Sequence, residues 1–149
     1  MNSNQTLDLA NLFQDRFVYQ QVVLQCMAQE SLDALLSPTG NIPAYILGAP
    51  IEPPLAGRTN SVWGLLGQHG FPTLSVPAGF TTHVFDRVRD AAARDGTRLV
   101  GPIPAKLSIG IMFVGRPFAE PTLLRIASAY EAGTKHRIPP PDFGPVPEE

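Results

Sequence analysis

Two polar side chains that could do chemistry together are Lys106 and Ser108, which stand two residues apart beside an apolar stretch. Residues two apart on a strand project from the same face, and a neutral lysine next to a serine can activate its hydroxyl as a nucleophile. The alternative is a solvated lysine at the mouth of the strand, because Lys106 closely follows the segment Pro102-Ile103-Pro104. We favour this alternative, since so short a motif arises easily by chance.

The sequence offers no other familiar catalytic or metal-binding signature. It contains no Gly-x-Ser-x-Gly elbow, no phosphate-binding glycine loop and no His-Glu-x-x-His motif. The three histidines, His69, His83 and His136, lie far apart without ligand spacing, so we predict neither a metal site nor a cofactor. Arg116 follows the apolar stretch, where open α/β sheets bind ligands, or else it forms a salt bridge or caps the next helix.

The element that would position these residues is an apolar strand over residues 107–114, followed by a helix over residues 121–130. Alternate positions of the strand are apolar on one side and apolar or small on the other, so we expect both of its faces to be covered. Pro121 favours the first turn of the helix, and apolar residues then recur at helical spacing. The pair forms half of a βαβ unit.

A strand covered on both faces needs neighbours on both edges, and only residues 31–37 and 72–77 are plausible partners. An amphipathic helix is predicted over residues 9–29, and Cys26 beside its apolar stripe is expected to pack as a small hydrophobe. These elements are few for 149 residues. The sequence therefore predicts an α/β fold with an incomplete sheet, few strands, flanking helices and long loops.

Proline and glycine interrupt the remainder of the chain, which holds 16 prolines and 13 glycines. Residues 38–58 are rich in both and predict a long loop of fixed turns. Residues 82–104 carry mixed charges and predict a solvated excursion. Residues 138–149 form a proline-rich acidic tail, which we expect to lie on the surface or to be disordered.

Charge and hydropathy exclude several classes of partner. The 11 basic and 13 acidic residues give a formal net charge of −2, which provides no field to gather nucleic acid or a membrane surface. No apolar run reaches the roughly 20 residues of a membrane helix, and no secretory signal precedes residue 30. A single cysteine cannot form an internal disulfide. We therefore expect a cytoplasmic protein that binds neither nucleic acid nor membranes.

Four segments along the chain carry a resemblance to one protein family. Residues 70–79 have the sequence Gly-Phe-Pro-Thr-Leu-Ser-Val-Pro-Ala-Gly, and residues 107–118 have the sequence Leu-Ser-Ile-Gly-Ile-Met-Phe-Val-Gly-Arg-Pro-Phe. Residues 32–39 and the helix over residues 120–131 match in the same order. Together the four segments resemble the amidase signature family, and the resemblance in register extends over about residues 12–141.

The resemblance implies amide-bond hydrolysis or transamidation by a serine nucleophile, a second serine across a cis peptide, and a lysine. Family members carry these groups in the first half of the domain, whereas the segments matched here belong to its last third. This sequence contains no Ser-Ser pair. The resemblance therefore implies the C-terminal portion of an amidase without catalytic residues of its own, which agrees with the shortage of strands.

The resemblance also implies candidate substrate-binding residues. Asn60 falls where amidotransferase-type members place an aspartate that contacts the substrate, and Gly67 falls where many members have asparagine. The neutral amide of Asn60 argues against recognition of a substrate ammonium there, and a turn-capping role is the alternative that we prefer. Trp63 is the other candidate for the substrate pocket, or else a core residue.

These observations divide the chain into residues 7–141, the C-terminal part of an amidase-signature domain, and residues 142–149, the tail. The first hypothesis is a truncated or split amidase that helps to form the pocket for a small-molecule amide and is inactive alone. The second hypothesis is a non-catalytic partner that completes its sheet with a complementary chain or as a homodimer. A free-standing small-molecule binder is the third, and only Trp63 and the apolar loop favour it.

Overall fold

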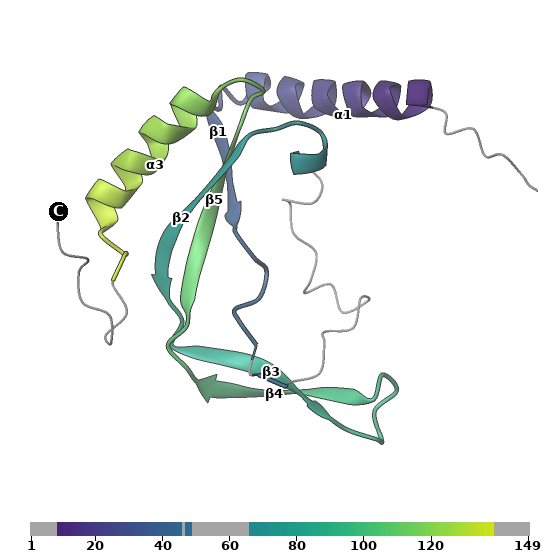
Figure 1. The fold of residues 1–149 in the computed structure, drawn as a ribbon, viewed down its shortest axis with the longest axis vertical. Coiled ribbons are helices and arrows are strands. Elements are labelled where there is room, and N and C mark those ends of the chain that lie inside the picture. The colour runs from purple at the N-terminus through teal and green to yellow at the C-terminus, as the bar shows by residue number, and fades with distance from the viewer. Residues whose placement is uncertain (1–8, 46, 49–65, 139–149) are drawn as a thin grey trace, which may run out of the picture.

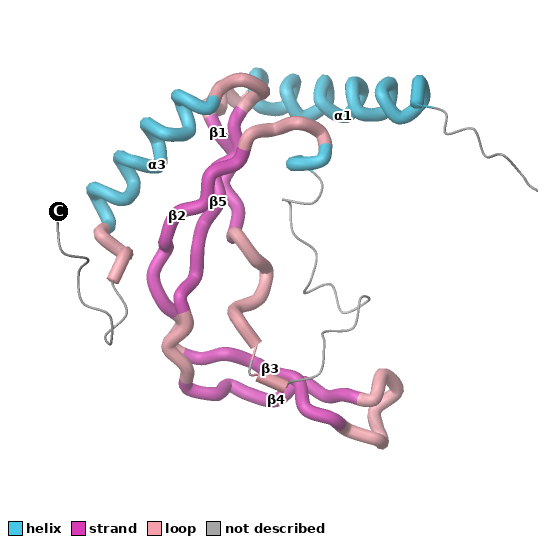
Figure 2. Tube along the Cα trace, in the orientation of Figure 1, coloured by secondary structure: helices cyan, strands magenta, loops and turns pink. Residues whose placement is uncertain are grey.

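The computed structural model describes residues 9–45, 47–48 and 66–138. A three-stranded sheet stands between two helices near one end, and a two-stranded hairpin crosses the opposite end (Figure 1, Figure 2). This arrangement confirms the predicted α/β class. The elements in chain order are α1 (Leu9–Gln29), β1 (Ala34–Pro38), β2 (Thr73–Phe80), β3 (His83–Arg89), β4 (Thr97–Pro104), β5 (Ser108–Gly115) and α3 (Glu120–Thr134).

Strand β5 is the centre of the three-stranded sheet, whose order is β1-β5-β2. Both neighbours are antiparallel to it, and they are the two segments that the sequence nominates as its partners. The register aligns Phe113 of β5 with Leu36 of β1 on one edge and with Leu74 of β2 on the other. The sequence thus predicts both neighbours of the central strand correctly.

Apolar side chains cover both faces of the second half of β5, as its residue pattern predicts. Val114 is fully buried on one face and Phe113 is buried on the other. Burying an aliphatic or aromatic side chain of this size contributes about 1.5–3 kcal/mol. The cluster on the α1 face contains Leu66, Phe71, Met112 and Val114, and the cluster on the α3 face contains Val76, Phe113, Leu123 and Ala127.

Helix α3 follows β5 after a short turn, as predicted, and extends to Thr134. Pro121 occupies its first turn together with Glu120, whose negative charge suits the helix N-terminus. The helix ends at Lys135, which is left-handed at φ 52° and donates its N–H to the Glu131 carbonyl. A parallel strand, which would complete a βαβ unit, is not among the strands of the described ranges.

Helix α1 has the predicted bounds, but the prediction that Cys26 is packed is wrong. The helix meets the sheet through Tyr19, Val23 and Leu24, and Met27 is fully buried. Cys26 lies on the flank of this stripe and is exposed. Much of α1 extends beyond the end of the sheet (Figure 1), so the sheet covers only part of the helix.

The charged stretch over residues 82–104 forms an antiparallel hairpin of β3 and β4, which the sequence analysis did not predict. Asp95-Gly96 lies at the end of the connection over residues 90–96, which is longer than the two-residue turn that an Asp-Gly pair commonly forms. Gly96 has φ 71°, and the Asp95 carboxylate accepts a hydrogen bond from the Thr97 N–H. The mixed charges concealed the two strands because the hairpin has no wide apolar face.

Gly115→Ala is expected to lower the free energy of unfolding by about 1–3 kcal/mol, the usual cost of overpacking a core. Gly115 is buried, and an added Cβ would lie 2.9 Å from Cγ of the buried Leu123. Urea unfolding followed by circular dichroism would measure the loss.

The matched control is Gly133→Ala in α3, where an added Cβ would meet nothing within 4 Å. Alanine should there stabilise the helix by about 0.5–1 kcal/mol. A Gly115→Ala variant as stable as wild type would contradict the close packing of β5 under α3.

Candidate functional site

The two residues predicted to bind substrate, Asn60 and Trp63, lie outside the described residues. Gly67, the nearby position where many family members have asparagine, lies in a helical turn that includes the buried Leu66. This turn is fixed to α1, because the Gln20 side-chain amide donates to the His69 carbonyl at 2.5 Å. The described turn over residues 66–70 is therefore anchored against α1.

Lys106 and Ser108 line different hollows of the surface, so the structure does not pair them. Ser108 is the first residue of β5, whereas Lys106 precedes the strand, and the alternation of a strand does not extend to it. The Lys106 ammonium lies 5.0 Å from the centre of the Phe80 ring, a contact of the cation–π kind. This position at the strand mouth matches the interpretation that we favour.

The junction between the sheet and the hairpin is held by the Thr81 hydroxyl. It donates to the Ala105 carbonyl at 2.6 Å and accepts from the Leu107 N–H at 3.0 Å. Beside it lies an open hollow of about 570 Å³, lined by Phe80, Thr81, Thr82, Pro104, Ala105 and Lys106. Lys106 is the only charged side chain that lines this hollow among the residues that the structure describes.

A second hollow, of about 430 Å³, lies between the turn after β1 and the first half of β5. Thr39 anchors the turn: its N–H donates to the Gly110 carbonyl at 3.0 Å, and its hydroxyl donates to the Ser75 hydroxyl at 3.2 Å. A side chain at position 110 would place its Cβ 2.9 Å from Thr39 Oγ1, so this close approach requires glycine. Residues 38–44 and 108–111 line the hollow.

The 430 Å³ hollow can hold a neutral ligand, but its described lining contains no group for proton transfer. Its polar side chains are hydroxyls and one amide, those of Thr39, Ser108 and Asn41. Its volume falls within the roughly 300–1,000 Å³ of small-molecule sites. The hollow is therefore suited to hydrogen bonding and not to acid–base chemistry.

The three histidines have separate local partners. His69 stacks on Tyr19 with ring centres 4.3 Å apart, and His83 contacts the Thr82 hydroxyl. The His136 ring nitrogen Nδ1 lies 3.2 Å from the Tyr130 hydroxyl. No group of three metal-ligating side chains occurs among the residues placed by the structure.

Arg116 bridges two distant segments of the chain. Its guanidinium donates to the Leu32 carbonyl at 3.1 Å, 84 positions earlier in the sequence. This bond ties the end of β5 to the segment before β1, so Arg116 contacts the backbone, where the sequence analysis considered a ligand-binding position or else a salt bridge or helix cap. Arg116 itself is exposed, directly after the end of β5.

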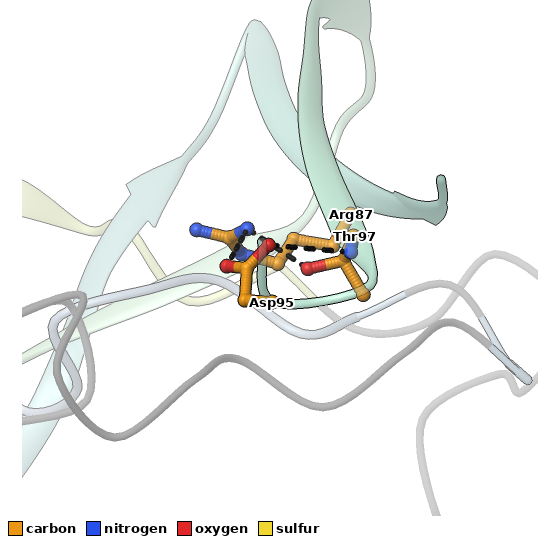
Figure 3. Close-up of polar contacts among 3 residues, drawn as sticks. All are labelled: Arg87, Asp95 and Thr97. Atoms are coloured by element: carbon orange, nitrogen blue, oxygen red, sulfur yellow. Dashed lines mark hydrogen bonds and ion pairs between the residues drawn. The ribbon is translucent and has the colours of Figure 1, made fainter. Parts of the chain in front are cut away.

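The hairpin carries a polar cluster that the sequence analysis missed (Figure 3). Arg87 of β3 donates from Nη1 to Asp95 at 3.2 Å and to Thr97 at 3.0 Å. These contacts join the turn to both strands. The adjacent Asp86 is buried, and its Oδ2 has no hydrogen-bond partner in the described part of the chain. The cluster stabilises the turn of the hairpin, and none of its residues lines the 430 Å³ or the 570 Å³ hollow.

Comparison with known proteins defines the class of this chain. The matching proteins are amidase-signature enzymes, so the predicted relationship with the amidase signature family is confirmed. No family model matches the chain. No solved structure matches it. None of the helices in the described ranges is long and apolar enough to cross a membrane.

The relatives are, by name, A-type subunits of glutamyl-tRNA(Gln) amidotransferase. The chain is 37% identical to that of Desulforudis audaxviator over 117 residues, 77% of this chain and 19% of the relative. It is 39% identical to that of Myxococcus xanthus over 105 residues, 70% of this chain and 17% of the relative. The protein of Methanosarcina barkeri is 34% identical over 117 residues, 77% of this chain and 20% of the relative. The chain thus spans about a fifth of the length of these relatives.

Thr81→Val is expected to loosen the junction between the sheet and the hairpin, because it removes the donor to Ala105 and the acceptor for Leu107 together. Leaving such groups unpaired costs about 1–3 kcal/mol where they are buried, and less at this half-buried site. Hydrogen exchange should be faster at the Leu107 amide.

Thr82→Val is the neighbouring control. Thr82 is exposed, and its hydroxyl contacts only the adjacent His83 ring among the contacts that the structure gives. Equal exchange rates at Leu107 in the two variants would show that Thr81 does not hold the junction.

Proposed function

We propose that this chain is the C-terminal part of an amidase domain, where it supplies part of the substrate pocket and of the supporting sheet. The catalytic serines and the lysine would come from polypeptide outside these 149 residues. The observation that carries the proposal is the match to amidase-signature relatives over about a fifth of their length, in a chain without a Ser-Ser pair. Alone, the chain would be inactive.

The hollows of the described residues favour a binding role over a catalytic one. The 430 Å³ hollow offers hydroxyl and amide groups, which suit the carbonyl and amino groups of a small carboxamide. We further propose Asn60 and Trp63, which lie outside the described residues, as pocket residues, on the resemblance of the surrounding sequence to the amidase signature family. A neutral amide at position 60 favours an uncharged part of the substrate.

A partner chain is the natural extension of this proposal. The relatives are by name subunits of an amidotransferase, so related proteins act in association with other chains. The second candidate function is a non-catalytic partner that completes its sheet with another chain, and the outer edges of the described three-stranded sheet favour it. In either case we propose that the protein acts in the cytoplasm.

The purified chain is expected to release no ammonia from a panel of small carboxamides. It should gain activity when co-expressed with the Desulforudis audaxviator relative from which the 117 matching residues are deleted. The reason is that each polypeptide then supplies what the other lacks. Coupled ammonia detection measures both reactions.

Two results would contradict the proposal. One is amide hydrolysis by the chain alone that survives Lys106→Met, which would mean that another catalytic centre is present. The other is a stable but inactive pair. The shortened relative expressed without the chain is the control for residual activity.

The pocket residues are tested in the active pair. Asn60→Ala and Trp63→Ala should each raise KM by about 10-fold with little change in kcat, because they remove binding that is equal in the ground and transition states. An unchanged KM in both variants would assign these residues to turn and core.

A further inference from the structure

The hollow at the base of the hairpin has no ligand assigned to it in the proposed function. Its volume of about 570 Å³ falls within the roughly 300–1,000 Å³ of small-molecule sites. Phe80, which lines it at the end of β2, pairs with Ser108 of β5, and Ser108 lines the 430 Å³ hollow. The two hollows therefore flank one pair of residues. The larger one is called the Lys106 hollow below.

Hydrogen bonds hold the backbone on both sides of Lys106. The Ala105 N–H donates to the Thr82 carbonyl at 3.1 Å, and the Ala105 carbonyl accepts from the Thr81 hydroxyl at 2.6 Å. Leu107 is held in the same way, because its carbonyl accepts from the Thr81 N–H at 2.9 Å and its N–H donates to the Thr81 hydroxyl. A site whose frame is fixed before binding loses less entropy when a ligand binds. Lys106 therefore stands on a preformed frame.

The Lys106 ammonium has an aromatic neighbour and no described anion beside it. It lies 5.0 Å from the centre of the Phe80 ring, which stabilises a cation without neutralising its charge. No ion pair joins Lys106 to a carboxylate among the residues that the structure describes. The neighbouring sequence is also free of acids, since residues 53–85 and 96–119 contain no aspartate or glutamate. The hollow therefore carries a positive charge that no described carboxylate balances.

The remaining lining of the Lys106 hollow favours a particular kind of anion. Phe80, Pro104 and Ala105 give the hollow apolar walls, and the exposed Thr82 adds a hydroxyl. An ammonium and a hydroxyl can both donate hydrogen bonds to a carboxylate, which only accepts them. The apolar walls suit a hydrocarbon body attached to that carboxylate. The described lining of the 430 Å³ hollow, in contrast, contains no charged side chain.

We infer that the Lys106 hollow binds a small organic carboxylate, an acid with an apolar body, through the Lys106 ammonium. An acid of this kind is the class of compound that hydrolysis of a carboxamide releases. The inference goes beyond the proposed function and does not depend on it, because neither Asn60 nor Trp63 lines this hollow.

Benzoate and benzamide are the probes, because they have nearly the same shape and differ in charge. When the ¹⁵N-labelled 149-residue chain is titrated and followed by NMR, benzoate should shift the amide signals of residues 80–82 and 105–106. Its Kd at these signals should be below about 10 mM. Benzamide should bind there at least about 10-fold more weakly, since a neutral amide lacks the charge that pairs with the ammonium.

Lys106→Met should weaken benzoate binding by about 10-fold, and Lys106→Arg, which keeps the charge, should stay within about threefold of wild type. Lys135→Met is the matched control, because Lys135 is also an exposed lysine but lies at the end of α3 and does not line the hollow. It should leave the benzoate affinity unchanged. Circular dichroism checks the fold of each variant, and the comparison of the two probes on the wild-type chain needs no variant.

Several results would overturn the inference. They are equal affinities for benzoate and benzamide, benzoate shifts confined to other parts of the chain, and equal effects of Lys106→Met and Lys135→Met. Tighter binding of an acetylated peptide of three glutamates at the same amides would also overturn it, because the occupant would then be an acidic segment of a protein. The proposed function is tested separately by ammonia release, so either proposal can fail while the other stands.

Discussion

The whole arrangement depends on the burial of β5 from both faces. Val114 on one side and Phe113 on the other make the strand the common core of two apolar clusters, one under α1 and one under α3. Because a strand in this position must be paired on both edges, β1 and β2 are drawn together from segments far apart in the sequence. The two helices α1 and α3 pack against the opposite faces of this three-stranded sheet.

The rest of the structure is open in comparison with this core. The first half of β5 is less covered than the second, and the turn at Thr39 and the junction at Thr81 are fixed by hydrogen bonds more than by apolar packing. These joints frame hollows lined by hydroxyls and backbone groups. The described hollows can bind a small molecule through hydrogen bonds. The relatives of this chain are amidase-signature enzymes.

The distribution of exposed apolar residues is as informative as the core. Leu36 and the row along α1 are of the type that a finished globular domain covers. Strand β2, in contrast, carries the proline and the bulge expected of a strand that ends a sheet. The two edges of the sheet therefore differ in their residues, although both flank the same central strand.

Local pattern alone determined the three strands of the main sheet, both helices and the resemblance to the amidase signature family. These follow from alternation, helical periodicity and motif order, which are properties of neighbouring residues. The hairpin was not predicted, because its strands carry mixed charges and its connection over residues 90–96 is longer than a two-residue turn. Only the tertiary structure decided that Lys106 and Ser108 occupy separate hollows, that Cys26 is exposed, and that Leu36 is exposed while Leu74 is half-buried. The reason is that burial depends on which distant segment packs against each face, and long-range pairing sets this.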